Sequence, residues 1–201
     1  MYKLASAKRG NTSSEVSCAV VTTRVDPVQD LFETSEVILA MLDDQRELSL
    51  RSRIENEFRK SIALSAASMF ESDIKDLIER FCHETGSGDT RLASLVKIKI
   101  LDRQYHTLFS WDSRNANSFF GLFGEAFKAE AQDDVAADGQ LEEGIRAFLE
   151  LGRLRNDLVH NNYATFPFDE TTSEVIVLYR KGRKFTDYLE AKLLEPPEGQ
   201  A

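Results

Sequence analysis

The chain has 201 residues, a formal net charge of −9 and 42% hydrophobic residues. This length and composition suit one globular domain with its own core, while the acidic charge argues against a general nucleic-acid coat, because phosphate binding depends on Lys and Arg. No apolar run approaches the ~20 residues that a membrane span needs, and we expect no secretory signal. Two cysteines are too few for a disulfide framework, so we expect a cytoplasmic protein without a membrane segment.

The first half of the chain predicts two long helices after a loose start. Residues 1–25 are rich in Ser, Thr and small residues, and we expect a flexible arm with a strand-like stretch at Val16–Val21. Asp26-Pro27 has the residue types of a helix N-cap and first helical position, and the helical period continues to about Leu48. A second helix, the clearest in the sequence, follows and is predicted to end at the stop signal Gly86-Ser87-Gly88.

Three further helices are predicted over about 92–111, 117–127 and 141–160, because apolar residues recur there at helical spacing. Asn117 is expected to cap the second of these helices. The acidic stretch Gln132–Gly139 is expected to be a polar loop. These boundaries leave short connections between neighbouring helices, as in a compact bundle.

The sequence of the segment Thr172–Leu194 is compatible with two structures. A closing helix is favoured by one apolar face, which contains Val175, Leu178, Gly182, Phe185 and Leu189. A β-hairpin also suits the segment, because two strand-like stretches flank Lys181-Gly182. With the helical alternative, the chain predicts an all-α bundle of about five to six helices over residues 26–195, followed by a tail at 196–201.

Residues 155–160 read Arg-Asn-Asp-Leu-Val-His, so an arginine and a histidine are separated by four residues at the end of a late helix. Histidine transfers protons near neutral pH, and arginine offers a fixed charge and a donor fork that fits phosphate oxygens. RNA carries its own nucleophile, the 2′-OH beside the scissile phosphate, so these two residue types suit its cleavage. On a straight helix Arg155 and His160 lie about 140° apart, so they approach one another only if the helix ends or bends.

This pattern resembles the R-x4-H motif of the HEPN superfamily of small all-helical domains, in the form with a polar Asn directly after the Arg. The stretch Ala66–Glu71 is similar to the Phe-Glu segment in the long early helix of that superfamily. Phe148–His160, followed by a short loop and a closing helix, resembles its end. The resemblance covers about residues 50–195 and is closest to the RiboL-PSP-HEPN type.

The resemblance implies a metal-independent endoribonuclease, a hydrolase without a cofactor that acts as a homodimer. Two copies of the motif would form one composite site, in which Arg155 and His160 are catalytic and Asn156 orients the substrate or the histidine. The expected substrate is RNA, and the expected products end in a 2′,3′-cyclic phosphate. Such proteins serve as toxins or in defence against phage, so an antitoxin or regulatory protein is an expected partner.

Other residues are assigned around this motif. Glu71 is either an ordinary exposed residue or a contact that steadies Arg155. Asp157 is assigned to a helical ion pair with Arg153, four residues earlier. The candidates for binding RNA are the basic residues Arg153, Arg180, Lys181, Arg183 and Lys184, although those on the last helix also suit a solvated face.

Two other functions stay open. A non-catalytic module with the same fold would bind a nucleotide, RNA or a partner protein, and the acidic net charge and Asp157 favour it. A purely structural oligomerisation domain is the other alternative, in which His160 only caps its helix. No metal site is predicted, because Cys82-His83 has no partner at zinc spacing, and His106 stands alone in the sequence.

Overall fold

The computed structural model describes residues 26–86 and 90–194, and every regular element within them is a helix. The expected all-α class is therefore confirmed. The arm at 1–25, with its strand-like stretch, and the tail at 196–201 lie outside the described residues. No helix in the described ranges is long and apolar enough to cross a membrane.

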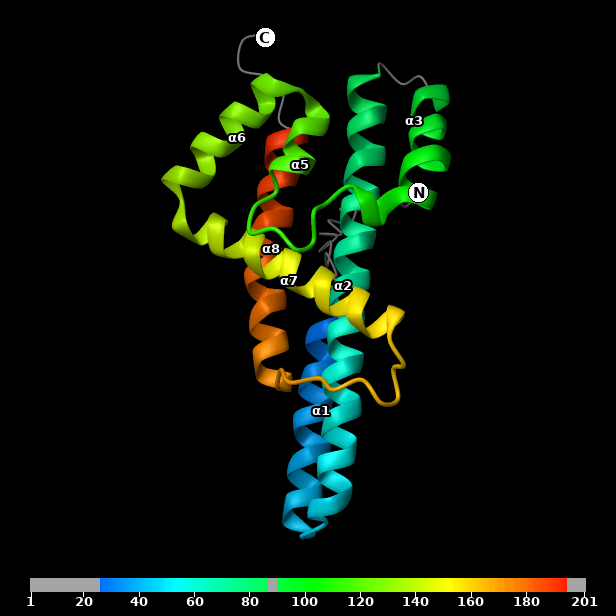
Figure 1. Ribbon diagram of the computed structural model, residues 1–201, viewed down its shortest axis with the longest axis vertical. Coiled ribbons are helices and arrows are strands. Elements are labelled where there is room, and N and C mark those ends of the chain that lie inside the picture. The colour runs from blue at the N-terminus through cyan, green and yellow to red at the C-terminus, as the bar shows by residue number, and fades with distance from the viewer. Residues whose placement is uncertain (1–25, 87–89, 195–201) are drawn as a thin grey trace, which may run out of the picture.

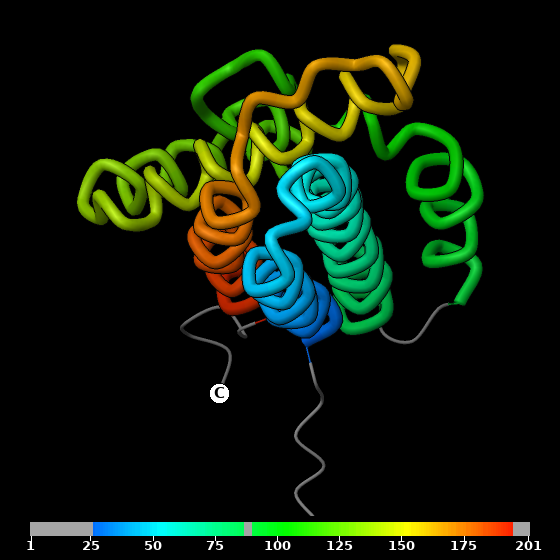
Figure 2. Tube along the Cα trace, turned by 90° about the horizontal axis from the view of Figure 1, so that it is seen from below, coloured from blue at the N-terminus to red at the C-terminus, as the bar shows by residue number. Residues whose placement is uncertain are grey.

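Three long helices lie side by side and form one layer of the molecule (Figures 1 and 2). They are α1 (Pro27–Asp44), α2 (Leu48–Thr85) and α8 (Thr172–Leu194). A fourth long helix, α7 (Gly139–His160), crosses over α2 and α8 and packs most extensively against α8. The β-hairpin alternative for the last segment is wrong, because α8 is one continuous helix whose apolar face is buried.

The start of α1 follows the sequence prediction, but its end does not. The Asp26 side chain caps the helix, because its Oδ1 accepts hydrogen bonds from the amides of Val28 at 2.9 Å and Gln29 at 3.2 Å. The helix ends at Asp44 rather than near the expected Leu48. Arg46 has a φ of 59°, and this left-handed residue turns the chain directly into α2.

The single helix expected over 92–111 is divided into short elements. They are α3 (Thr90–Val96), a π-helical turn (Lys97–Leu101), α4 (Asp102–Gln104) and a 3-10 turn (Tyr105–Thr107). A π-helical turn adds a residue to the helical repeat and changes which side chains face the neighbouring helix. The chain therefore leaves α2 at this point and bends toward α7.

The expected acidic loop is also wrong, because this part of the chain is helical. A short α5 (Asn117–Phe120) and a 3-10 turn (Gly121–Phe123) lead into α6 (Glu125–Ala137). Asn117 is the first residue of α5 rather than its cap, since Ala116 holds the cap position. The acidic side of α6 packs on α8, where Tyr188 and Lys192 bind its carboxylates.

The centre of the core lies where α7 crosses the long helices. The Phe148 ring of α7 lies 5.1 Å from the Phe70 ring of α2 and 5.1 Å from the Phe185 ring of α8. Gly182 of α8 permits this approach, because a Cβ there would lie 2.6 Å from Cζ of Phe70. The absence of a side chain at this position brings three helices into contact.

We predict that Gly182→Ala destabilises the protein by about 1–3 kcal/mol, because the added methyl group overpacks the core. This loss opposes the gain of about 1 kcal/mol that Ala brings to a helix interior. The net change in the free energy of unfolding is measured by urea denaturation of the variant and the wild type. Gly139→Ala is the control, since nothing lies within 4 Å of a Cβ built there. Equal stability of the two variants would contradict this packing.

Candidate functional site

The motif occupies the last two turns of α7, which ends at His160. Asn161 caps this end: its backbone amide and its side-chain Nδ2 both donate to the carbonyl oxygen of Asp157, at 3.1 and 2.7 Å. The predicted stop at Asn161 is confirmed. Asn161 rather than His160 therefore caps the helix, and the imidazole of His160 is exposed at the helix end.

Two cations of α2 fix the loop that follows the motif. Lys60 is 1% exposed, and its Nζ donates to the carbonyl oxygen of Tyr163 at 2.8 Å and lies 5.1 Å from the centroid of the Tyr163 ring. Arg59 donates from Nη1 to the carbonyl oxygen of Phe168 at 3.3 Å. These contacts hold the chain beyond His160 against α2 and thereby fix where α7 ends.

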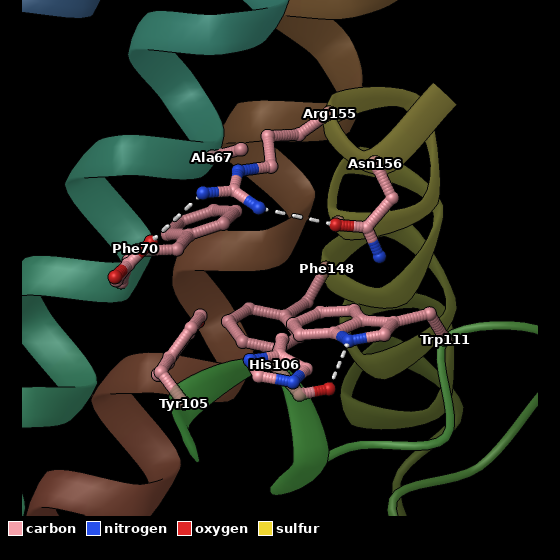
Figure 3. Close-up of a pocket in the computed structure, with 10 residues that line it drawn as sticks. Ala67, Phe70, Tyr105, His106, Trp111, Phe148, Arg155 and Asn156 are labelled. Carbon is pink, nitrogen blue, oxygen red and sulfur yellow. Dashed lines mark hydrogen bonds and ion pairs between the residues drawn. The ribbon is translucent and has the colours of Figure 1, made fainter. Parts of the chain in front are cut away.

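Arg155 extends from α7 toward α2 and lies between two polar partners (Figure 3). Its Nη1 donates to Oδ1 of Asn156 at 3.2 Å, and its Nη2 lies 3.7 Å from Oε2 of Glu71. The other oxygen of Glu71 accepts a shorter hydrogen bond, 2.7 Å, from Lys75. Glu71 therefore orients Arg155 loosely while it binds Lys75 more closely.

The acidic residue inside the motif is directed away from Arg155. Asp157 lies 2.7 Å from Nη1 of Arg153, as expected from their spacing, and Glu150 lies 2.6 Å from Nη2 of the same guanidinium. The hydrogen bonds that Arg153 donates to Glu150, followed by the charges of Glu150 and Asp157, raise the pKa of Arg153. Arg153 therefore neutralises both carboxylates on one side of α7 and leaves Arg155 on the other.

Arg155 and His160 line one cleft between α2, α7 and the segment that follows α3. This motif cleft is lined by Glu71, Lys75, Arg103, His106, Arg155 and His160, with Leu101, Asp102, Tyr105 and Val159 completing its wall. The cations Lys75, Arg103 and Arg155 outnumber the carboxylates Glu71 and Asp102. A cleft with this charge in an acidic protein favours an anionic ligand.

An aromatic pocket adjoins the motif cleft, and Arg155 and His106 line both (Figure 3). The Trp111 ring stacks on Phe148 at a centroid distance of 6.0 Å and lies directly over Gly152 of α7. Tyr105 closes one side of the pocket. Burial raises the pKa of its phenol far above the usual range, so Tyr105 keeps its proton at neutral pH.

The structure separates two of the basic residues predicted to bind RNA from the motif cleft. Arg180 donates to Oε1 of Gln29 at 2.8 and 3.1 Å, on the α1 side of α8. Arg183 lies 2.6 Å from Asp73 of α2. Neither lines the motif cleft.

Lys181 and Lys184 lie on the side of α8 that faces α7, and Arg153 lies on α7 itself. Lys181 pairs with Glu143 at 2.9 Å and shares a second pocket with Arg153, beyond Trp111. The Cβ of Lys184 faces Gly144 of α7. Of the five predicted residues, the structure thus brings only Arg153 and Lys181 together in one pocket.

Sequence reasoning did not place Lys75, Arg103, His106 or Trp111 in the site. The spacing of Glu71 and Lys75 fits a helical ion pair and was available as a signal. The other three belong to the short elements and loop between α3 and α5, where the sequence predicts one continuous helix and so gives no sign of the turn that brings them to the site. The described residues contain no group of three or more His, Cys, Asp or Glu side chains that would hold a metal ion.

We predict that Gly152→Ala displaces the Trp111 indole, because a methyl group on Gly152 would overlap the indole ring. Trp111 is the single tryptophan of the chain, so its fluorescence reports on this pocket alone. The emission maximum should move to longer wavelength as the indole enters water. Gly139→Ala serves as the control, and an unchanged emission maximum in Gly152→Ala would contradict the packing.

Comparison with protein-family models matches residues 29–195 to the RiboL-PSP-HEPN family. Searches of the curated proteins and of the solved structures returned no significant match. The matched range contains α2 with Glu71, α7 with Arg155 and His160, all of α8 and nearly all of α1. Because the match spans most of its length, the chain belongs to the RiboL-PSP-HEPN family.

Proposed function

We propose that this protein is a metal-independent endoribonuclease in which Arg155 and His160 carry the reaction. Membership of a HEPN family supports a module of the ribonuclease-like kind. The observation that carries the proposal is that Arg155 and His160, about 140° apart on an ideal helix, line one cleft with an excess of cations. Only a proton-transfer group and a cation for the phosphate are needed, because RNA supplies its own nucleophile.

The proposed reaction is a transesterification within the RNA chain. The 2′-oxygen attacks the adjacent phosphorus, the bond from phosphorus to the 5′-oxygen breaks, and the products are a 2′,3′-cyclic phosphate and a 5′-hydroxyl. His160 donates a proton to the leaving 5′-oxygen, a role that suits an imidazole at a helix C-terminus. Arg155 stabilises the added negative charge on the phosphorane oxygens.

The contacts of Arg155 suit this role. Its side chain is 34% exposed, and the 3.7 Å separation from Glu71 exceeds hydrogen-bond distance. The guanidinium is therefore oriented but retains donors for a phosphate. Asn156 accepts from Arg155 through its Oδ1, so its side-chain amide is left to donate to the substrate.

We further propose that two copies of the chain meet at the motif and form a composite site. Val159, next to His160, is 54% exposed at the edge of the motif cleft. More apolar side chains are exposed on α3 and the turn after it: Leu92, Leu95, Ile98 and Ile100. In a twofold dimer the same patch meets itself, and two motifs would face one cleft.

The biological role proposed for this activity is that of a cytoplasmic toxin or an anti-phage effector, which damages RNA when released from an antitoxin or regulatory protein.

A second function is supported by the acidic net charge and by the carboxylate of Glu71 beside Arg155. In that case the same cleft binds a nucleotide, RNA or a partner protein without cleaving it.

We predict that the purified protein cleaves RNA in excess EDTA and that His160→Ala reduces the rate about 10²–10⁴-fold, the usual contribution of a proton-transfer group. Arg155→Ala should cause a comparable loss. Gel analysis of a labelled single-stranded RNA measures both. His83→Ala is the matched control, because His83 is exposed in the last turn of α2 and does not line the motif cleft. RNA binding by the wild type without any cleavage would favour the non-catalytic module.

A composite site predicts complementation between inactive variants. In a mixture of Arg155→Ala and His160→Ala, mixed dimers retain one arginine and one histidine from different copies. The mixture should therefore cleave RNA faster than either variant alone, whereas two independent sites would give no gain. Sedimentation analysis of the same samples establishes that the dimers form.

A further inference from the structure

His106 is a second histidine in the motif cleft and lies outside the motif. It lines the cleft together with Arg155 and His160, and it also lines the adjoining aromatic pocket (Figure 3). Its side chain is exposed, so it is accessible to a ligand in the cleft. The chain has three histidines, and the third, His83, lies on the last turn of α2.

The helix that carries the motif also fixes the backbone at His106. Trp111 donates from Nε1 to the carbonyl oxygen of His106 at 2.8 Å. The indole in turn rests on Gly152 and Phe148 of α7, one to two turns before Arg155. The position of His106 is thus tied to α7 through Trp111 and not only to its own 3-10 turn.

The neighbour of His106 in the chain anchors the same turn on α2. The Tyr105 ring lies 5.9 Å from the Trp111 ring and 5.6 Å from Nζ of Lys75. The π-helical turn at Lys97–Leu101 redirects the chain from α2 toward α7 just before these residues. The turn is therefore held from two sides, and within residues 26–86 and 90–194 the His106 imidazole makes no hydrogen bond that competes with a substrate.

We propose that His106 is a catalytic residue of the RNA cleavage and acts as its general base. This inference rests on the proposed function. Neutral His106 takes the proton of the 2′-OH as the 2′-oxygen bonds to phosphorus, and protonated His160 gives a proton to the 5′-oxygen as its bond to phosphorus breaks. One proton is taken up and one is released, so the pair returns to its starting state after proton exchange with water.

His106 is a second imidazole in the cleft that Arg155 and His160 line. In a composite site built from the motif alone, a second copy's His160 would have to act as the base. His106 removes that requirement, so one His160 is enough for each composite site, and mixed dimers with Arg155 and His160 on different copies still contain every group that the reaction needs. The two arrangements therefore predict different RNA cleavage rates for a variant without His106.

The test compares His106→Ala and His106→Gln with the wild type and with His83→Ala. Both His106 variants keep the backbone carbonyl that Trp111 binds, so circular dichroism and tryptophan fluorescence should not change. We expect kcat to fall about 10²–10⁴-fold in both variants, with little change in KM, because Gln forms hydrogen bonds but does not transfer a proton at neutral pH. His83→Ala should cleave at the wild-type rate.

A substrate with sulfur in place of the 5′-bridging oxygen separates the two histidines. A thiolate leaves without protonation, so this RNA should restore much of the cleavage lost in His160→Ala but not that lost in His106→Ala. Wild-type cleavage by His106→Ala, with His160→Ala inactive, would overturn the inference and leave the proposed function standing. Rescue of His106→Ala by the sulfur substrate would also overturn its assignment as base. No cleavage of either substrate by the wild type would reject the proposed function itself.

Discussion

The crossing of α7 over α2 and α8 positions both the motif and the turn that contains His106. At Gly182 the absence of a side chain brings α8 against Phe70 and Phe148, and at Gly152 it allows Trp111 to lie on α7. The first contact fixes where α7 sits, and the second fixes the turn that contains His106. Core packing therefore determines the shape of the motif cleft, although no core residue takes part in the proposed reaction.

The arrangement of charge explains how an acidic protein presents a site for an anion. Arg153 binds Asp157 and Glu150, and Lys75 binds Glu71 more closely than Arg155 does. Exposed ion pairs of this kind contribute at most about 1 kcal/mol to stability. Their effect is on orientation, because the carboxylates nearest the motif are held by other cations and Arg155 keeps donors for a phosphate.

Part of this structure can be predicted from short-range patterns in the sequence. The cap at Asp26 and the end of α7 at Asn161 depend on neighbouring residues, and the sequence predicts both. The turn at Arg46 was missed, because a left-handed residue other than glycine carries no clear signal. The sequence predicts a loop for the acidic side of α6, because the residues that bind its carboxylates, such as Lys192, lie far along the chain on α8. The place of His106 in the cleft could not be predicted from the sequence, because only contacts with distant residues bring it there.

The motif cleft is proposed to cleave RNA through the 2′-OH without a metal ion. The decisive experiment is analysis of the product ends after incubation of a defined RNA with the wild-type protein in excess EDTA. We expect 2′,3′-cyclic phosphates and 5′-hydroxyls, because the 2′-oxygen is the nucleophile. Products with 3′-hydroxyl and 5′-phosphate ends, or cleavage that requires a divalent cation, would contradict it.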